Sequence, residues 1–282
     1  MLTKSRRRLF PIMNALVIAG MLLAACGGNA STGDASEPPL VEATAVGGED
    51  AARAGSPNPD TFVQATFGEP ETLDPALGYD TASNEIIQNI YEPLVAYDDI
   101  HTDRFVPMLA ESWTVSEDGA TYTFKIRSGV KFHEGQDLTA EDVAYSFQRG
   151  LLFGGYNGPQ WLLAEPFFGI GVDDITCLVD GCASADDREA LSANDPAALL
   201  AACERVKAVI TADEAGRTVT MTLSQPWAPF LSTIAQTWGS VLDKDWTVAS
   251  GGWDGSCETW QDYYAEPSES DPLSMTVNGT GP

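Results

Sequence analysis

The sequence predicts a folded body that mixes strands and helices, an α/β or α+β fold. Residues 112–126 carry two runs of alternating apolar side chains around Asp118-Gly119, which is typical of a β-hairpin. Residues 83–94 and 138–151 instead space their apolar side chains three and four positions apart, as an amphipathic helix does. Because both periods occur in one chain, the elements favour a mixed fold.

The first regular element is expected at 61–67, where alternate residues of "TFVQATF" are apolar, as in a strand. Glycine and prolines within 68–75 then break this pattern. The helix at 83–94 follows, and Pro93 marks its end because proline cannot continue a helix.

The hairpin at 112–126 and the helix at 138–151 supply most of the predicted core. Thr139 and Asp142 at the start of this helix resemble a capping box, with Asp in place of Glu. The side chains assigned to the core are aromatic residues on regular apolar faces: Trp113, Tyr122, Phe124, Phe132 and Phe147.

The second half of the chain is expected to alternate loose and regular segments. In order, these are a loose stretch rich in Gly and Asp at 153–195, a short helix through Leu199 and Cys203, a hairpin at 205–224 that turns at 213–216, a helix after Pro226 through Ile234, and an irregular acidic and aromatic stretch at 245–275. Asp195 and Pro196 suit the cap and the first turn of the short helix.

The N-terminus has the order of a secretory signal: a basic leader, an apolar run and small residues. The apolar run, Leu9–Ala25, is short for a membrane span, which needs about 20 apolar residues. Leu23-Ala24-Ala25-Cys26 resembles the lipobox of bacterial lipoproteins, which implies that Cys26 becomes the lipid-bearing first residue. The alternatives are an ordinary small cysteine within the apolar run, or an uncleaved N-terminal anchor.

Residues 1–25 are therefore interpreted as a lipoprotein signal peptide and 26–60 as a flexible tether. The tether is rich in Gly, Ala, Pro and acidic residues and has no apolar period. We expect an exported protein that acyl chains hold at the outer face of the cell membrane, in a periplasm or at the cell surface.

Composition excludes one class of partner. The formal net charge is −26, and such a surface repels nucleic acid and anionic lipid. A hydrophobic content of 44% with 7 Trp, 8 Tyr and 11 Phe is sufficient for a packed core, so the chain is not a disordered acidic protein.

Four cysteines remain beside Cys26: Cys177, Cys182, Cys203 and Cys257. In an oxidising compartment they are expected to form disulfides, and the sequence leaves all three pairings open. With only His101 and His133 as histidines and no C-x-x-C pair, we expect no metal site and no cofactor.

Two blocks carry a resemblance to a known family. The first is "EPETLDPALGYDTASNEIIQNIYEPLVAYDD" at 69–99, and the second spans 105–151 with "PMLAESW", "DGATYTF", "RSGVKFHEG" and "LTAEDV" in order. Both resemble the N-terminal part of family 5 extracellular solute-binding proteins, the dipeptide-, oligopeptide- and nickel-binding components of ABC importers. "SQPWAPFL" and "VNGTGP" are similar to later segments of that family, so the resemblance covers most of 61–282.

The resemblance implies a periplasmic-binding-protein-like clamp of type II, cluster C-like, with a mixed sheet, in which two lobes close on a ligand. Residues 61–150 would begin the large lobe, 151–225 would form an extra small domain, and 226–282 would return to the large lobe. Family members continue for about as long again, so we expect a partial sequence that lacks the second lobe and binds weakly or not at all. The implied partners are an oligopeptide or related small solute and membrane permease subunits, with the binding protein itself a monomer.

The resemblance also indicates candidate ligand-binding residues. Glu69 and Thr72 lie in the loop after the first strand, which borders the family's cleft, and an acidic group there would attract a cationic ligand. Tyr156, Trp161 and Trp238 fall near the cleft by the same analogy, although aromatic residues are also common in cores. Asp74-Pro75 is interpreted as a turn, and His133 as a structural residue.

Two other classes of function compete with a binding protein. An exported hydrolase could use paired carboxylates, but Glu141-Asp142 opens a helix, where acidic groups meet the helix dipole favourably. No nucleophile elbow, H-E-x-x-H motif or P-loop is present, so no catalytic residue is assigned. A lipid-tethered adhesin or scaffold would differ from a binding protein in having no saturable small ligand.

Overall fold

The computed structural model describes residues 60, 65, 68–154, 158–169 and 171–282. All of them except Asp60 belong to one compact unit, Gln64–Pro282. The predicted leader, Cys26, the tether and almost all of the predicted strand at 61–67 lie outside the described residues and stay predictions.

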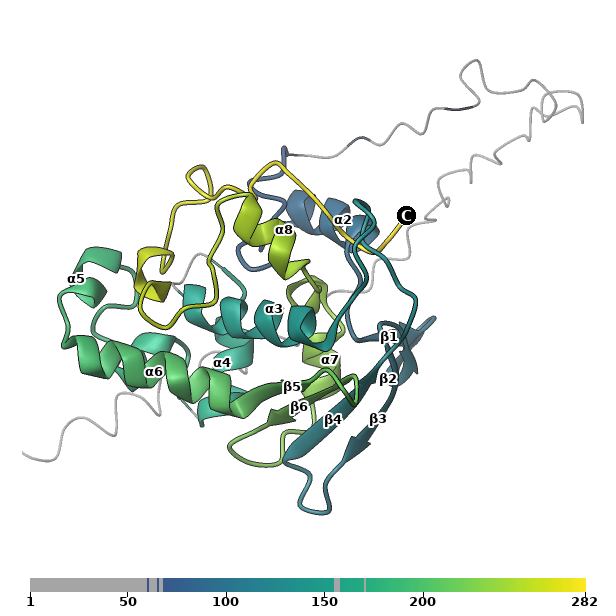
Figure 1. Cartoon of the computed structure of the whole chain (residues 1–282), viewed down its shortest axis with the longest axis horizontal. Coiled ribbons are helices and arrows are strands. Elements are labelled where there is room, and N and C mark those ends of the chain that lie inside the picture. Colours follow the sequence, from purple (N-terminus) through teal and green to yellow (C-terminus); the bar gives the residue numbers. More distant parts are fainter. Residues whose placement is uncertain (1–59, 61–64, 66–67, 155–157, 170) are drawn as a thin grey trace, which may run out of the picture. The chain divides into compact units, whose positions relative to one another are not determined.

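The described body mixes strands and helices, as the sequence predicts (Figure 1). The strands are β1 (Val95–Asp98), β2 (His101–Pro107), β3 (Ala110–Val115), β4 (Thr121–Ile126), β5 (Ile210–Asp213) and β6 (Thr218–Thr222). The helices are α2 (Thr81–Ile90), α3 (Ala140–Phe153), α4 (Trp161–Phe168), α5 (Arg188–Ser192), α6 (Pro196–Val209), α7 (Phe230–Ile234) and α8 (Lys244–Ala249), with the short 3-10 helices η2 (Ile175–Leu178), η3 (Thr237–Gly239) and η4 (Trp260–Asp262). Strands β3-β4-β6-β5 form a four-stranded sheet, and β1-β2 form a separate hairpin.

The four-stranded sheet is antiparallel and has one apolar and one polar face. Across the central pair, Tyr122 lies opposite Met221 and Phe124 opposite Val219, and all four side chains are buried. Threonines alternate with them along both strands and are mostly only partly buried. One face of this sheet therefore packs on the core, as is common for antiparallel sheets. The predicted hairpin at 112–126 is confirmed.

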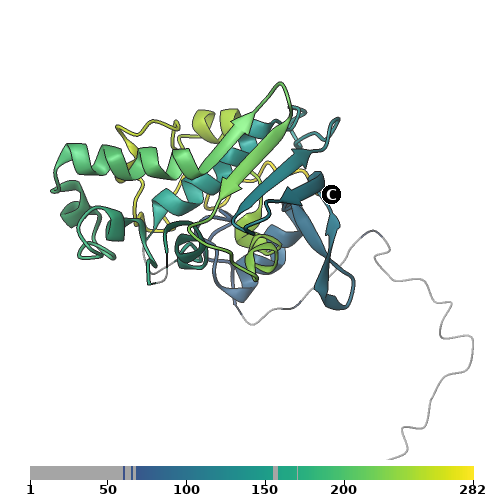
Figure 2. The same ribbon diagram turned by 90° about the horizontal axis from the view of Figure 1, so that it is seen from below.

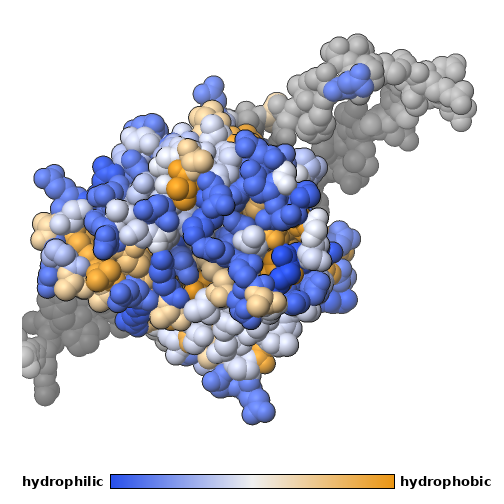
Figure 3. Space-filling model, in the orientation of Figure 1, coloured by the Kyte–Doolittle hydropathy of each residue, from blue (hydrophilic) through white to orange (hydrophobic). Residues whose placement is uncertain are grey.

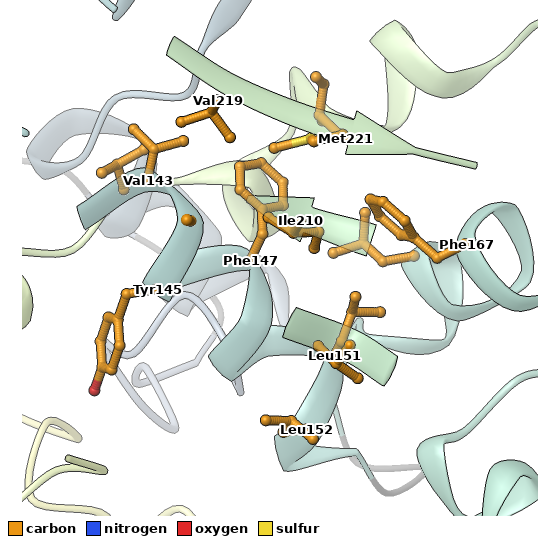
Figure 4. Close-up of a cluster of buried hydrophobic side chains, with 14 of the residues drawn as sticks. Val143, Tyr145, Phe147, Leu151, Leu152, Phe167, Ile210, Val219 and Met221 are labelled. Carbon is orange, nitrogen blue, oxygen red and sulfur yellow. The ribbon is translucent and has the colours of Figure 1, made fainter. Parts of the chain in front are cut away.

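Helix α3 covers the apolar face of the sheet and contacts β5 and β6 (Figure 2). Its capping box is present: the Asp142 backbone N–H donates to Thr139 Oγ1 at 3.1 Å, and the Thr139 N–H donates to Asp142 Oδ2 at 2.8 Å. Val143 and Phe147 point from α3 toward Val219 and Met221 (Figure 4). The predicted helix at 138–151 is thus confirmed, including its cap.

Helix α2 begins slightly before the predicted helix at 83–94. Asp80 is its N-cap, and the Asp80 carboxylate accepts the Ser83 N–H at 2.9 Å. The helix ends at Ile90 and the chain is extended at Tyr91, because Pro93 disfavours helical backbone just before it.

The prediction for residues 205–209 is wrong. They were expected to begin a strand, but α6 runs on through Val209, and β5 starts only at Ile210. Leu199, Cys203 and Val206 are buried at helical spacing. This apolar stripe favours helix even in 205–209, where apolar and polar residues also begin to alternate as in a strand. The cap at Asp195, the turn before Thr218 and the second strand are confirmed.

Two stretches expected to be irregular contain helices. The loose stretch at 153–195 includes α4, α5 and η2, and the stretch at 245–275 includes most of α8 and η4. The sequence contains signals for two of these helices, because aspartate is a preferred N-cap residue. Asp187 and Asp243 are N-caps in the structure, and each accepts a backbone N–H from the first turn. The hairpin β1-β2 is a further element that the sequence analysis did not predict.

Four of the five aromatic residues assigned to the core are buried, and Trp113 is only partly buried. Trp113 lies on β3, the edge strand, which has a sheet neighbour on one side only. Seen from outside, the face in Figure 3 is largely hydrophilic with small scattered apolar spots, in keeping with an acidic surface over an apolar core.

The disulfides pair Cys177 with Cys182 and Cys203 with Cys257. The expectation of disulfides is confirmed, and one of the three open pairings is selected. The second bridge fastens α6 to the acidic and aromatic segment before η4, so that Trp260 packs beneath α6 and its indole N–H donates to the Leu199 carbonyl at 3.1 Å.

Candidate functional site: an acid-lined pair of hollows

The loop at 68–80 is fastened to the start of α2. The backbone N–H groups of Glu71 and Thr72 donate to Ser83 Oγ at 3.0 and 3.2 Å. Ser83 is fully buried in the first turn of α2. Its hydroxyl oxygen therefore ties the loop to this helix. The Glu71 side chain remains exposed at the surface.

Beneath this loop lies a buried ionic cluster formed by Asp74, Arg149 and Asp271. Arg149 Nη1 donates to Asp74 Oδ1 at 2.7 Å, and Nη2 pairs with Asp74 Oδ2 in a bidentate contact. Asp271 Oδ1 is 3.7 Å from Arg149 Nη2. The side chains of Asp74 and Arg149 are wholly buried, and that of Asp271 is 3% exposed. Three segments far apart in sequence therefore meet at one guanidinium group.

The two carboxylates of the cluster have opposite pKa shifts. Burial disfavours the charged form of Asp74, but the Arg149 guanidinium outweighs burial and holds the pKa of Asp74 below its ordinary value. Burial, and then the charge of Asp74, raises the pKa of Asp271 to about 8. One guanidinium group thus favours a single carboxylate, and the second carboxyl tends to keep its proton.

The chain segments that carry Asp74 and Asp271 also line a hollow of about 260 Å³, here called the rim hollow. Its lining combines the 68–80 loop, the residues around the end of α3 and the loop that leads to Asp271: Glu71, Thr72, Leu77, Gly154, Gly158, Ala265, Glu266, Pro267, Ser268 and Glu269. Three of these side chains are glutamates and none is cationic, although Glu266 Oε1 lies 3.6 Å from Arg188 Nη1. The hollow suits a group that carries positive charge.

A second, more open hollow adjoins the first at Glu71, which lines both. Its lining is also acidic: Ala65, Gly68, Glu69, Glu71, Asp80, Thr81, Ala82 and Glu85. The two hollows together place acidic side chains from three chain segments along one stretch of surface.

The structure brings two of the predicted ligand-binding residues to these hollows. Glu69 is exposed and lines the second hollow. Thr72 lines the rim hollow but is 1% exposed, and its Oγ1 accepts the Asp74 N–H at 3.1 Å. Thr72 therefore shapes the turn as well as the lining.

The three aromatic candidates do not gather with them in the part of the chain that the structure describes. Tyr156 lies outside the described residues. Trp161 opens α4 and is 41% exposed, but lines neither hollow. Trp238 is partly buried in η3 and lies 6.5 Å, centroid to centroid, from Tyr79 of the 68–80 loop.

Sequence reasoning missed Arg149, Asp271, Glu266 and Glu269. Arg149 sits on the apolar face of α3 where a charge is unexpected, and this was the one available signal. The acidic residues after Ala265 belong to an irregular segment, and only the fold shows that it borders the 68–80 loop. Asp74, expected only to shape a turn, also holds the buried Arg149.

His133 is structural, as expected. Its backbone N–H donates to the Gly279 carbonyl at 2.9 Å, and its Nε2 lies 2.8 Å from the Gly281 carbonyl oxygen. It thereby fastens residues 278–281 to the body.

Among the described residues, one group of possible metal ligands gathers closely: Asp173, Cys177 and Cys182. Both sulfur atoms are bound to each other in a disulfide, so they are not thiolate ligands. No helix in the described part of the chain combines the length and hydrophobicity needed to span a bilayer.

Comparison with known proteins gives a consistent result. Residues 104–282 match the model of "Bacterial extracellular solute-binding proteins, family 5 Middle". The dipeptide-binding protein of Escherichia coli is 31% identical over 208 residues, which cover 70% of this chain and 32% of that protein. The heme-binding protein A of Haemophilus influenzae is 43% identical over 105 residues, 35% of this chain and 19% of that protein.

Among solved structures, the periplasmic binding protein DppA of Helicobacter pylori, in complex with the peptide STSA, aligns with a TM-score of 0.46 and 25% identity. The alignment covers 76% of this chain and 34% of the other. The chain thus spans about a third of the length of the relatives that it matches over most of its own length.

Proposed function

Because the chain belongs to family 5 of the bacterial extracellular solute-binding proteins, we propose that it acts in an ABC importer as the component that captures a solute outside the membrane and delivers it to a permease. The family consists of binding proteins and not of enzymes. The match over residues 104–282 is the observation that carries this proposal.

The proposed solute is a peptide or a similar small molecule with a positively charged group. Relatives with different printed ligands, a dipeptide-binding and a heme-binding protein, both match this chain, so the choice of solute rests on the site. Glu69, Glu71 and Glu269 line the two hollows. A peptide amino group would be attracted to this set of carboxylates.

Trp238 is the aromatic candidate that the structure places against the 68–80 loop. Trp238, held against Tyr79, could support an apolar part of the solute from the side of η3. Tyr156 and Trp161 stay in the proposal on the family resemblance alone, since Tyr156 lies outside the described residues and Trp161 lines neither hollow. The lobe boundaries proposed for this clamp remain 61–150, 151–225 and 226–282.

Export and anchoring complete the proposal. Cys26 would be acylated after cleavage of residues 1–25, and the tether at 26–60 would let the body move near the membrane. Changing Cys26→Ser should abolish incorporation of radiolabelled palmitate and release the protein from the membrane fraction. Palmitate labelling that persists in this variant would contradict the anchor.

The importer role is tested by the genes that flank this coding sequence. We expect two genes for multi-span permeases and at least one for an ATPase with a P-loop, because a binding protein delivers solute only to such partners. A neighbourhood without transporter genes, together with unchanged peptide uptake after deletion of the gene, would contradict the role and leave the fold untouched.

A further inference from the structure

The buried cluster contains two carboxyl groups but only one cationic group. Asp74 and Asp271 face the single cation Arg149, and only Asp74 makes the bidentate contact. Asp271 Oδ2 is buried without a hydrogen-bond partner among the described residues. An ionised Asp271 would thus leave an unpaired charge in the interior, which is costly.

The surroundings offer Asp271 little compensation. From the loop at 68–80 it faces Asp74, from α3 it faces Arg149, and from its own segment it accepts the Leu273 backbone N–H. Tyr91, which directly follows α2, also faces the cluster, and Tyr145 and Tyr263 lie near Arg149. The only cation among these groups is already paired with Asp74. A protonated Asp271 could instead donate a hydrogen bond to Asp74, whose carboxylate is within reach.

Asp271 is also the point at which one wall of the rim hollow is fastened. Residues 265–269 line the hollow and lead directly to Asp271. Just beyond, the Leu73 N–H donates to the Ser274 carbonyl at 2.7 Å and joins this segment to the 68–80 loop. The protonation of Asp271 is therefore expected to affect the position of both walls of the hollow.

We propose that Asp271 is a positioning residue that is neutral when the segment 265–274 is docked, and that its ionisation releases this segment and weakens solute binding at the rim hollow. The statement about solute binding rests on the proposed function. The statement about docking does not.

The direction of the pH dependence follows from the geometry. The folded protein holds the proton on Asp271 more tightly than the unfolded chain does, because burial and Asp74 raise its pKa to about 8. This contribution to the free energy of unfolding is fully present below about pH 4 and is lost as the pH rises to about 8. If docking requires the neutral form, the docked fraction falls about tenfold between pH 7 and pH 9.

Hydrogen exchange at the Leu73 amide tests docking without any ligand. After correction for intrinsic exchange, its protection should fall about tenfold from pH 7 to pH 9 in the natural protein, and should change less than twofold in Asp271→Asn. Asparagine is uncharged at every pH and keeps a donor for Asp74. Asp103→Asn, an exposed carboxyl on β2, is the matched control and should behave as the natural protein does.

The decisive quantity is the difference between the natural protein and Asp271→Asn, because a change of pH also acts on other groups of the protein. Equal pH profiles for these two proteins would overturn the proposal. Should Asp271→Asn fail to fold, the infrared spectrum of the natural protein decides. The stretching band of a protonated carboxyl group must be present at pH 7 and absent at pH 10, and a spectrum without it at pH 7 overturns the proposal.

Trialanine binding at pH 7 and pH 9 tests the link to the solute site. Its dissociation constant should rise about tenfold in the natural protein and stay constant in Asp271→Asn. An increase of the same size in both proteins would overturn the link. If trialanine binds at neither pH, the link to solute binding fails for this chain, while the amide exchange of Leu73 still decides the role of Asp271.

Discussion

Arg149 is the residue on which the described loops most depend. Its side chain is wholly buried and pairs with Asp74 through both terminal nitrogens. Replacing one member of a buried ion pair leaves the other charge without compensation. Arg149→Ala should therefore lower the free energy of unfolding by about 3–5 kcal/mol, as measured by urea denaturation at pH 7.

The exposed pair of Lys131 and Asp137 provides the control. These side chains are 57% and 69% exposed and lie 2.8 Å apart, so solvent screens their attraction. Lys131→Ala should change the free energy of unfolding by less than about 1 kcal/mol. If both variants lost similar stability, the buried cluster would not have the role assigned to it.

A second prediction at this scale concerns Thr139, the N-cap of α3. Its hydroxyl accepts the Asp142 N–H, and α3 forms much of the core. Thr139→Ala should lower the free energy of unfolding, measured by urea denaturation, by about 1 kcal/mol. Thr139→Ser keeps the acceptor and should lose much less, so equal losses would speak against the cap.

Single residues also show which features a sequence can reveal. The capping box of Thr139 and Asp142 is visible because its partners are three positions apart. The cluster of Asp74, Arg149 and Asp271 is not visible in this way, since its members are separated by most of the folded chain and no local period relates them. A buried arginine on an apolar helix face was the only local trace.

At the scale of elements, the two disulfides should differ in their effect. The bridge from Cys203 to Cys257 spans 54 residues, whereas that from Cys177 to Cys182 spans 5. In the chain-entropy model, a longer loop gives greater stabilisation. The double alanine variant of the long bridge should lose about 4 kcal/mol in urea denaturation, and that of the short bridge about 2 kcal/mol. The reverse order would argue against the long bridge as the main constraint on this region.

The docking of residues 278–281 against the end of α2 gives another prediction. A Cβ atom at Gly279 would lie 2.0 Å from the Ile90 carbonyl oxygen, which no side chain can occupy without backbone movement. Gly279→Ala should therefore weaken the contact with His133 and lower the thermal midpoint by several degrees. Gly68→Ala has open space around the new Cβ, and its midpoint should stay within about one degree of the natural value.

The elements also explain where the sequence misled. In 205–210, Val206, Ala208 and Ile210 alternate as in a strand, but Val206 also continues the helical stripe from Leu199 and Cys203. A local window cannot choose between two periods that share a residue, and tertiary packing against α3 decides for the helix. The hairpin at 112–126 and α3 were predictable because only one period occurs in each.

The whole molecule combines the sequence pattern of a known family with an acid-lined surface. The family could be recognised from motifs in the two N-terminal blocks, and the match over 104–282 confirms it. The walls of the rim hollow could not be foreseen, because they come from loops whose contacts are set by the fold. Among the five ligand-binding candidates, the two from the 68–80 loop reach the hollows, since their loop is short and fixed to α2.

The most direct test of solute capture is a titration of the isotope-labelled chain with trialanine, followed by amide chemical shifts at pH 7. We expect saturable shifts at Glu71, Thr72 and Glu269, with a dissociation constant of about 1 mM or weaker. The affinity should be low because the match covers only about a third of the length of the relative. N-acetylated trialanine lacks the cationic amino group and should shift these amides far less. Glu71→Gln should weaken binding, whereas Asp103→Asn should not. The absence of saturable shifts, or equal shifts with both peptides, would contradict the account.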